Sequence, residues 1–125
     1  NAEKLGINPQ DTLFEVLSGT LPLDSERQQE ARVWMGFAAA ALPDSEIRKL
    51  HVSGNHTWLQ RIIRLLTDCI PTASPSESQG LAIRLVALTE GLATLSSLDP
   101  DTYNADTQRS ILTDEIDALL STRQT

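Results

Sequence analysis

The chain has 125 residues, of which 40% are hydrophobic and 22% are charged. This length suits one domain, and the composition is that of a folded soluble protein and not of a disordered one. The formal net charge is −7. Because Lys and Arg supply most of the affinity for phosphate, such an acidic domain should not bind nucleic acid by itself. We expect a single domain over residues 1–125.

The cellular compartment follows from what the chain lacks. Cys69 is the single cysteine, so no intramolecular disulfide can form, which fits a reducing cytoplasm. No apolar run approaches the roughly 18–20 residues that span a bilayer. The first ten residues also lack the basic and apolar parts of a signal peptide. We therefore predict a cytoplasmic protein that does not enter a membrane.

Helix-start signals divide the chain into five segments. They are Asn8 before a proline, Ser25 in a capping-box pattern, Asp44 after a proline, Ser74 followed by Pro-Ser-Glu, and Asn104 after a turn. No segment alternates with the period of a strand. The predicted fold class is an all-α helical bundle with helices over residues 9–18, 25–42, 45–70, 75–98 and 105–121.

The segment 75–98 is apolar on nearly all sides. One stripe repeats leucine at helical spacing, from Leu81 to Leu95, and one flank of it carries small residues. That flank consists of Gly80, Ala87, Gly91 and Thr94. A helix of this kind must be covered on nearly all sides, and small residues allow close approach of a helix from a second subunit.

The segment 105–121 offers a partner for that interface. It carries one apolar stripe that includes Leu112, Ile116 and Leu119. Doubling the last two helices about a two-fold axis would give a four-helix dimer interface. In the alternative, both helices pack inside a monomeric bundle. We predict a homodimer and keep the monomer open.

The two middle helices carry the chain's tryptophans. In 25–42, Trp34 and Phe37 share a face and four alanines follow, which indicates a central helix that either packs tightly or lines a cavity. Tight packing is the commoner case. In 45–70, His51 and Asn55 lie on the same apolar stripe as Trp58. Polar groups there require hydrogen-bond partners.

Four motifs resemble the C-terminal domains of TetR-family transcription regulators, especially the betaine-regulator (BetI-like) type. The segment LVALTEGL at 85–92 is similar to the family's LVALxDGL signature, with Glu90 in place of the usual Asp. LDPD at 98–101 looks like the turn before the final helix. Upstream, LPLD at 21–24 and EARVWMGF at 30–37 resemble a loop and helix of the family. Order and spacing match from Asn8 to Leu120.

The resemblance implies a two-domain transcriptional repressor whose N-terminal helix-turn-helix DNA-binding domain is absent from this chain. The C-terminal domain would bind an unidentified small-molecule effector among its central helices, dimerise through its last two helices, and thereby control DNA release. The absence of a basic DNA-contacting half also accounts for the acidity. An alternative function is a purely structural dimerisation module without a ligand.

The inward faces predict the lining of an effector pocket. The candidate ligand-binding residues are Phe14, Trp34, Phe37, His51, Asn55, Trp58, Ile62, Leu88 and Leu92. Such pockets are mostly apolar with a few polar groups that orient the ligand, here His51 and Asn55. The three aromatic residues on the middle helices could form a cage for a cation. The alternative is that these residues are ordinary core or are satisfied by backbone and solvent.

The sequence offers no catalytic, metal or cofactor site. His51 and His56 are five residues apart and do not share a helix face, as a zinc pair would. Residues 99–110 lack the glycine and the final Glu of a calcium loop. Cys69 has no basic neighbour that would activate it. We therefore predict that the protein is not an enzyme.

Overall fold

The computed structural model describes residues 8–121, and within them it consists of five helices without a strand. They are α1 (Pro9–Ser18), α2 (Ser25–Ala41), α3 (Ser45–Cys69), α4 (Pro75–Leu98) and α5 (Ala105–Ser121). The predicted all-α class is confirmed, and every predicted helix boundary agrees to within one residue.

The helix starts are held by the side chains that the sequence indicates. Asn8, Asp44, Ser74 and Asn104 each accept a backbone N–H from the first turn that follows. Ser74 also forms a full capping box, because the Glu77 carboxylate reaches back to the Ser74 N–H. These caps satisfy N–H groups that have no partner inside the helix.

One cap differs from the prediction. The residue that caps α2 is Asp24 and not Ser25, because an Asp24 carboxylate oxygen accepts the Arg27 N–H at 2.8 Å. Ser25 is the first residue of the helix itself. An ionised oxygen at this position accepts a stronger hydrogen bond than a serine hydroxyl does. Its negative charge is also stabilised by the positive end of the helix dipole.

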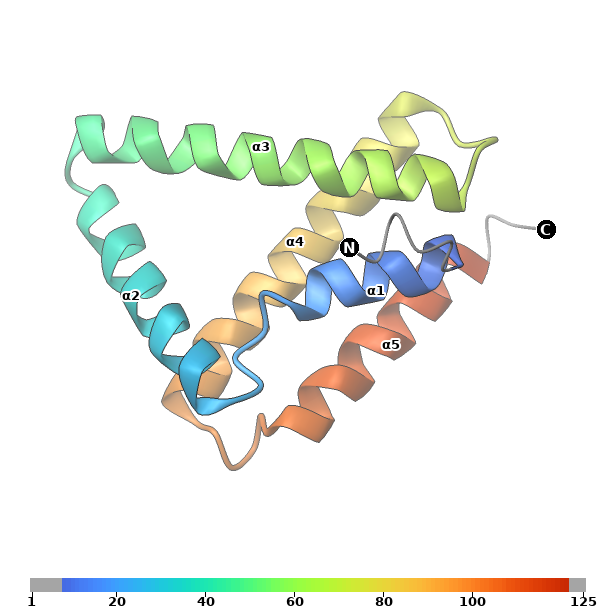
Figure 1. The fold of residues 1–125 in the computed structure, drawn as a ribbon. Coiled ribbons are helices and arrows are strands. Elements are labelled where there is room, and N and C mark those ends of the chain that lie inside the picture. Colours follow the sequence, from blue (N-terminus) through green and yellow to red (C-terminus); the bar gives the residue numbers. More distant parts are fainter. Residues whose placement is uncertain (1–7, 122–125) are drawn as a thin grey trace.

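α4 is the centre of the described fold and packs against all four other helices (Figure 1). Its buried stripe, which includes Leu81 and Leu85, meets α1, α3 and α5 in one cluster of buried side chains. α1 and α5 run beside each other and are joined by a hydrogen bond from Gln10 Nε2 to Asp117 Oδ1 at 2.6 Å. Four helices thus share one hydrophobic core.

α2 lies outside that core, so the expectation of a central helix is wrong. Ala41 is its one buried residue among the described ones, and α2 adds no side chain to the main cluster. Val33 and Leu42 are 65% and 74% exposed. α2 contacts α3 and α4 only at its inner face, and Figure 1 shows it standing along one edge of the molecule. The space between α2 and the core is where the site is found.

α4 also keeps a long apolar face uncovered. Its residues Ile83, Leu95 and Leu98 are 50%, 43% and 74% exposed. By length and composition alone α4 could cross a membrane, with a mean hydropathy of 1.4, and core helices of soluble proteins pass the same test. Of that apolar window only 33% is buried within the subunit. This part of α4 therefore stays exposed in the single subunit.

The core assignment predicts a large difference between two leucines of α3. Leu66 is 1% exposed and Leu50 is 68% exposed. Leu66→Ala should lower the free energy of unfolding by about 2–5 kcal/mol, since it removes buried methylene groups and leaves a cavity. Leu50→Ala, the same change on the same helix, should cost less than about 1 kcal/mol. Urea titration followed by circular dichroism measures both, and similar losses for the two variants would contradict the assignment.

Candidate functional site

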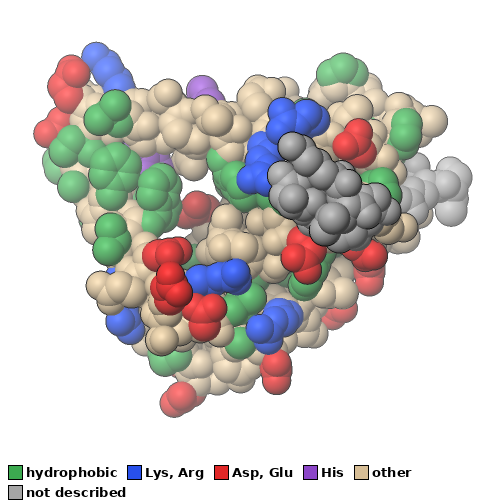
Figure 2. Space-filling view, viewed as in Figure 1, with side chains coloured by type: hydrophobic (Ala, Val, Ile, Leu, Met, Phe, Trp, Pro, Cys, Tyr) green, Lys and Arg blue, Asp and Glu red, His purple; other side chains and the backbone are tan. Residues whose placement is uncertain are grey.

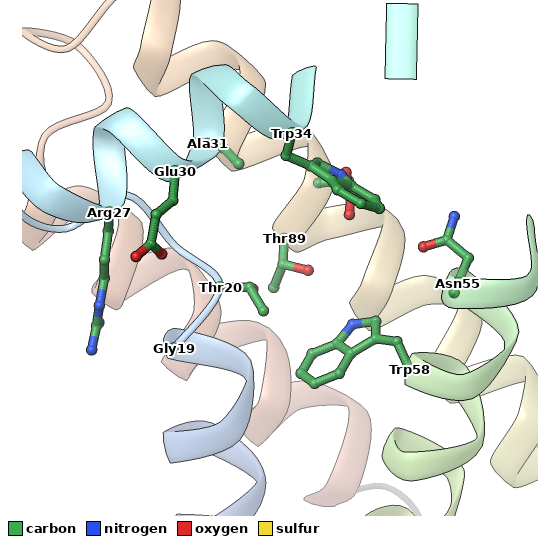
Figure 3. Close-up of a pocket in the computed structure, with 12 residues that line it drawn as sticks. Gly19, Thr20, Arg27, Glu30, Ala31, Trp34, Asn55, Trp58 and Thr89 are labelled. Atoms are coloured by element: carbon green, nitrogen blue, oxygen red, sulfur yellow. The ribbon is translucent and has the colours of Figure 1, made fainter. Parts of the chain in front are cut away.

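A cavity of about 360 Å³ opens between α2 and the core. Figure 2 shows the molecule hollowed there, between α2 and α3, with acidic side chains in view at the hollow. The residues that line it come from the α1–α2 loop and from three helices. They are Gly19, Thr20, Arg27, Glu30, Ala31, Trp34, Gly54, Asn55, Trp58, Thr89, Glu90 and Ala93 (Figure 3).

Helical periodicity brings these residues to one place. On α2, Arg27, Glu30 and Trp34 follow one another at spacings of three and four and so share a face. On α3, one turn supplies Gly54, Asn55 and Trp58, and on α4 one turn supplies Thr89 to Ala93. The cavity is therefore bounded by one face of each of three helices, with two indole rings at its wall.

An aromatic stack joins α2 to α3 beside the cavity. The Trp34 ring lies 4.8 Å from the His51 ring with 26° between their planes. Phe37 stacks on the same imidazole at 5.7 Å and lies 5.6 Å from Trp34. Because α2 has almost no core contacts, these three rings fix the position of Trp34 in the cavity wall.

His51 and Asn55 form the polar part of this contact. Asn55 Nδ2 lies 3.5 Å from His51 Nδ1, which makes a long hydrogen bond when that ring nitrogen is unprotonated. His51 Nε2 is buried and has no hydrogen-bond partner among residues 8–121. A buried unpaired polar atom costs about 1–3 kcal/mol of stability, and the stacking of Trp34 and Phe37 on the imidazole must offset this cost.

The second indole ring, that of Trp58, contacts an arginine of its own helix, α3. The Arg61 guanidinium carbon lies 5.9 Å from the centre of the Trp58 ring, within range of a cation–π contact. Trp58 is half-buried and packs against the core cluster. Its ring thus forms a fixed wall opposite Trp34 (Figure 3).

Three of the nine predicted ligand-binding residues line the cavity. These are Trp34, Asn55 and Trp58. Phe37 and His51 stand behind Trp34 in the stack. The remaining four are not at the cavity because they belong to the core or pack against it; they are Phe14, Ile62, Leu88 and Leu92. Their apolar stripes face the hydrophobic core and not the space under α2.

The sequence interpretation missed most of the polar lining. The predicted lining omits Glu30, Thr89 and Glu90, because charged and hydroxyl residues on a helix are usually solvated. The signal was present in α2, where Glu30 precedes Trp34 by four residues and so shares its face. Nothing in the local sequence reports that α4 turns Thr89, which is 3% exposed, toward the same space.

The predicted dimer residues divide into two groups. On α4, Gly80, Ala87 and Thr94 are exposed and Gly91 is half-buried, so this group stays available to a partner. The α5 group, Leu112, Ile116 and Leu119, is at most 8% exposed and belongs to the subunit's own core. These three side chains pack inside the subunit, which leaves them little surface for a partner, unlike the α4 group.

Sequence and structure comparisons assign the family. The profile of the BetI-type transcriptional repressor C-terminal family matches residues 9–121. The chain belongs to the TetR family. Its relatives include the HTH-type transcriptional regulator PksA from Bacillus subtilis (strain 168), 24% identical over 119 residues, which span 94% of this chain and 58% of PksA. The resemblance deduced from the four motifs is confirmed.

A solved structure agrees with this TetR-family assignment. The crystal structure of a transcriptional regulator from Rhodococcus sp. Rha1 superimposes with a TM-score of 0.85 and 27% sequence identity. The match covers 96% of this chain and 62% of that one. The chain thus spans about three-fifths of the length of the relatives it matches, and it is the C-terminal domain of a TetR-family transcriptional regulator.

The described part of this TetR-family domain offers little for metal binding or thiol chemistry. No group of three or more His, Cys, Asp or Glu residues within 8–121 is placed to hold a metal ion. Cys69 is half-buried, and its burial, together with the smaller effect of the neighbouring Asp68 carboxylate, raises the pKa of its thiol from 9.0 to about 11. Because a thiol reacts as its thiolate, Cys69 is protonated and unreactive near neutral pH.

This raised pKa predicts slow alkylation of the folded domain. A shift from 9.0 to about 11 lowers the thiolate fraction at pH 8 by about a hundredfold. Iodoacetamide should therefore modify folded Cys69 at least about tenfold more slowly than Cys69 in urea, with the rate followed by mass spectrometry. Equal rates in the folded and unfolded protein would contradict the burial of the thiol.

Proposed function

We propose that this domain senses a small-molecule effector in the cavity under α2 and dimerises through the exposed face of α4. The observation that carries the proposal is the cavity itself, about 360 Å³ with two indole rings in its wall. This volume is typical of small-molecule sites, which are concave, mostly apolar and furnished with a few polar groups. No catalytic step is part of the proposal.

The uncovered face of α4 supports dimerisation. Gly80, Ala87, Gly91 and Thr94 follow at spacings of seven, four and three, with Ile83 beside them. Since none of these side chains takes part in the buried cluster, a second α4 can approach closely across a two-fold axis. The leucine stripe of α5 is used inside the subunit, so α5 would contribute through its outer, polar face.

The DNA-binding function belongs to the proposal for the full-length regulator. PksA is named an HTH-type regulator, and this chain spans only 58% of it. We infer that a separate helix-turn-helix domain reads the operator in the cytoplasm as part of a repressor. Effector binding would favour one spacing of the two readers in the dimer and so release or retain DNA. The charge of −7 fits this division, because the acidic domain would not compete for phosphate.

The dimer proposal predicts opposite outcomes for two alanines. Ala87→Glu places a charge at the centre of the α4 face and should convert the dimer into a 13.7 kDa monomer in sedimentation. Ala39→Glu, on the exposed side of α2, should leave the dimer intact. A wild-type monomer, or a dimer that survives Ala87→Glu, would refute the interface.

The effector proposal predicts selective stabilisation by some small molecules. Ligand at a hundred times its Kd raises the free energy of unfolding by about 2.7 kcal/mol. A metabolite panel screened by thermal unfolding and Trp fluorescence should therefore contain compounds that raise the Tm. In Ala31→Phe the new ring fills the cavity and should abolish these shifts, whereas Ala40→Phe on the exposed side of the same helix should keep them. Silence across a broad panel would favour a structural dimerisation module without a ligand.

A further inference from the structure

The polar side chains at the cavity present hydrogen-bond acceptors almost throughout. Two are carboxylates, from Glu30 and Glu90, and three are neutral groups, from Thr20, Asn55 and Thr89. What each neutral group offers to a ligand depends on where its own protons are engaged. The hydrogen bonds within the domain show which acceptors these three side chains donate to.

The two threonine hydroxyls have already used their protons. Thr20 Oγ1 donates to the Leu17 carbonyl at 2.7 Å, and Thr89 Oγ1 donates to the Val86 carbonyl at 3.0 Å. A hydroxyl has one proton and two lone pairs. Both oxygens therefore turn lone pairs, and no proton, toward the cavity.

Asn55 is arranged in the same way. Its amide nitrogen is directed to His51 Nδ1 at 3.5 Å. This contact engages one of the two amide protons, and Figure 3 shows the carbonyl oxygen turned toward the side where the two indole rings lie. The stack that orients His51 thus also fixes which end of the Asn55 amide a ligand meets.

The charges at the cavity favour a cation. Arg27 is the basic residue among those that line it, and Arg27 Nε lies 3.8 Å from Asp24 Oδ2, which offsets its charge. Figure 3 shows the guanidinium turned away from the indole rings. Glu30 and Glu90 then leave the lining negative, and the faces of Trp34 and Trp58 attract positive charge.

We propose that the effector is an organic ammonium ion that donates hydrogen bonds, that is, a protonated primary or secondary amine with an apolar body. The apolar body lies between Trp34 and Trp58, and the two or three N–H groups of the ammonium are shared among the Glu30 and Glu90 carboxylates and the acceptor atoms of Thr20, Asn55 and Thr89. This inference rests on the proposed effector function of the same cavity.

Two competing ligand classes fit the lining less well. A quaternary ammonium ion satisfies the charge and the indole faces but donates no hydrogen bond, so the inward-facing acceptors stay unpaired. An anion meets the two carboxylates at short range and finds as side-chain donors only the indole N–H groups and the Arg27 guanidinium that Asp24 engages. Discrimination therefore comes from the N–H groups as well as from the positive charge.

The test compares three probes with one body and different head groups. (2-Naphthylmethyl)ammonium, its N,N,N-trimethyl counterpart and 2-naphthylacetate are titrated into the domain by calorimetry near neutral pH. The primary ammonium probe should bind about tenfold more tightly than the trimethyl probe and tighter still than the carboxylate. Its affinity should fall as salt is added, since both carboxylates are exposed on one side.

Charge-neutralising variants test whether the Glu30 and Glu90 carboxylates bind the ammonium probe. Glu30→Gln together with Glu90→Gln keeps the shape of the lining and should weaken the primary ammonium probe about tenfold, while the carboxylate probe is unchanged or strengthened. The matched control is Glu115→Gln with Glu26→Gln, which removes the same charge from exposed positions outside the cavity and should change neither affinity.

The outcomes separate the two proposals. A trimethyl probe that binds as tightly as the primary ammonium, or a carboxylate that binds best, would overturn the ammonium assignment and leave the effector cavity standing. Equal losses in the cavity pair and in the Glu115 control would also overturn it. If none of the probes binds and Ala31→Phe alters no ligand response, both the ammonium assignment and the effector function fail.

Discussion

The stacking of Trp34 on His51 is the contact on which the arrangement of this domain depends. α2 carries one buried residue, and the main core is formed by the other four helices. The stack, with ring centres 4.8 Å apart, therefore replaces core packing as the tie between α2 and α3. It holds α2 off the core and leaves the cavity of about 360 Å³. Without this standoff the small side chains of α2 would close on the core, as in an ordinary bundle.

A helix held in this way suits a sensor. Stability resides in the leucine cluster of α1, α3, α4 and α5, so a shift of α2 does not disturb it. A ligand between α2 and α4 adds contacts that exist in only one position of α2, and such differential contact is what allows a ligand to shift a conformational equilibrium. The buried, unpaired Nε2 of His51 lowers the cost of leaving the resting position, because moving the ring returns that atom to solvent.

The sequence predicted the helices well and their partners poorly, for a physical reason. Caps such as the Ser74–Glu77 box act within four residues, so the chain itself reports them. An apolar stripe, in contrast, indicates that another surface covers it but does not identify that surface. The side chains of Ile62 and Leu112 lie in the core, whereas Trp34 and Trp58 line the cavity. Glu30 was not predicted at the cavity, because a carboxylate on a helix usually faces solvent and its sequence position does not show which side chains lie opposite it.

α4 connects the two proposed activities within a single turn. Thr89 and Glu90 lie at the cavity, and Ala87 and Gly91 lie on the face offered to a second subunit. Ala87 and Glu90 are three residues apart, so the two surfaces adjoin along α4. The proposed ammonium ion, drawn toward Glu90, would pull on the same backbone that carries the proposed interface, without a chain of intervening side chains. Since the leucine stripe fixes the third face of α4 in the core, the helix can respond mainly by rotating or sliding along that stripe. In the proposed dimer such a movement would change the angle between the two subunits, which is the quantity that a paired DNA reader would register.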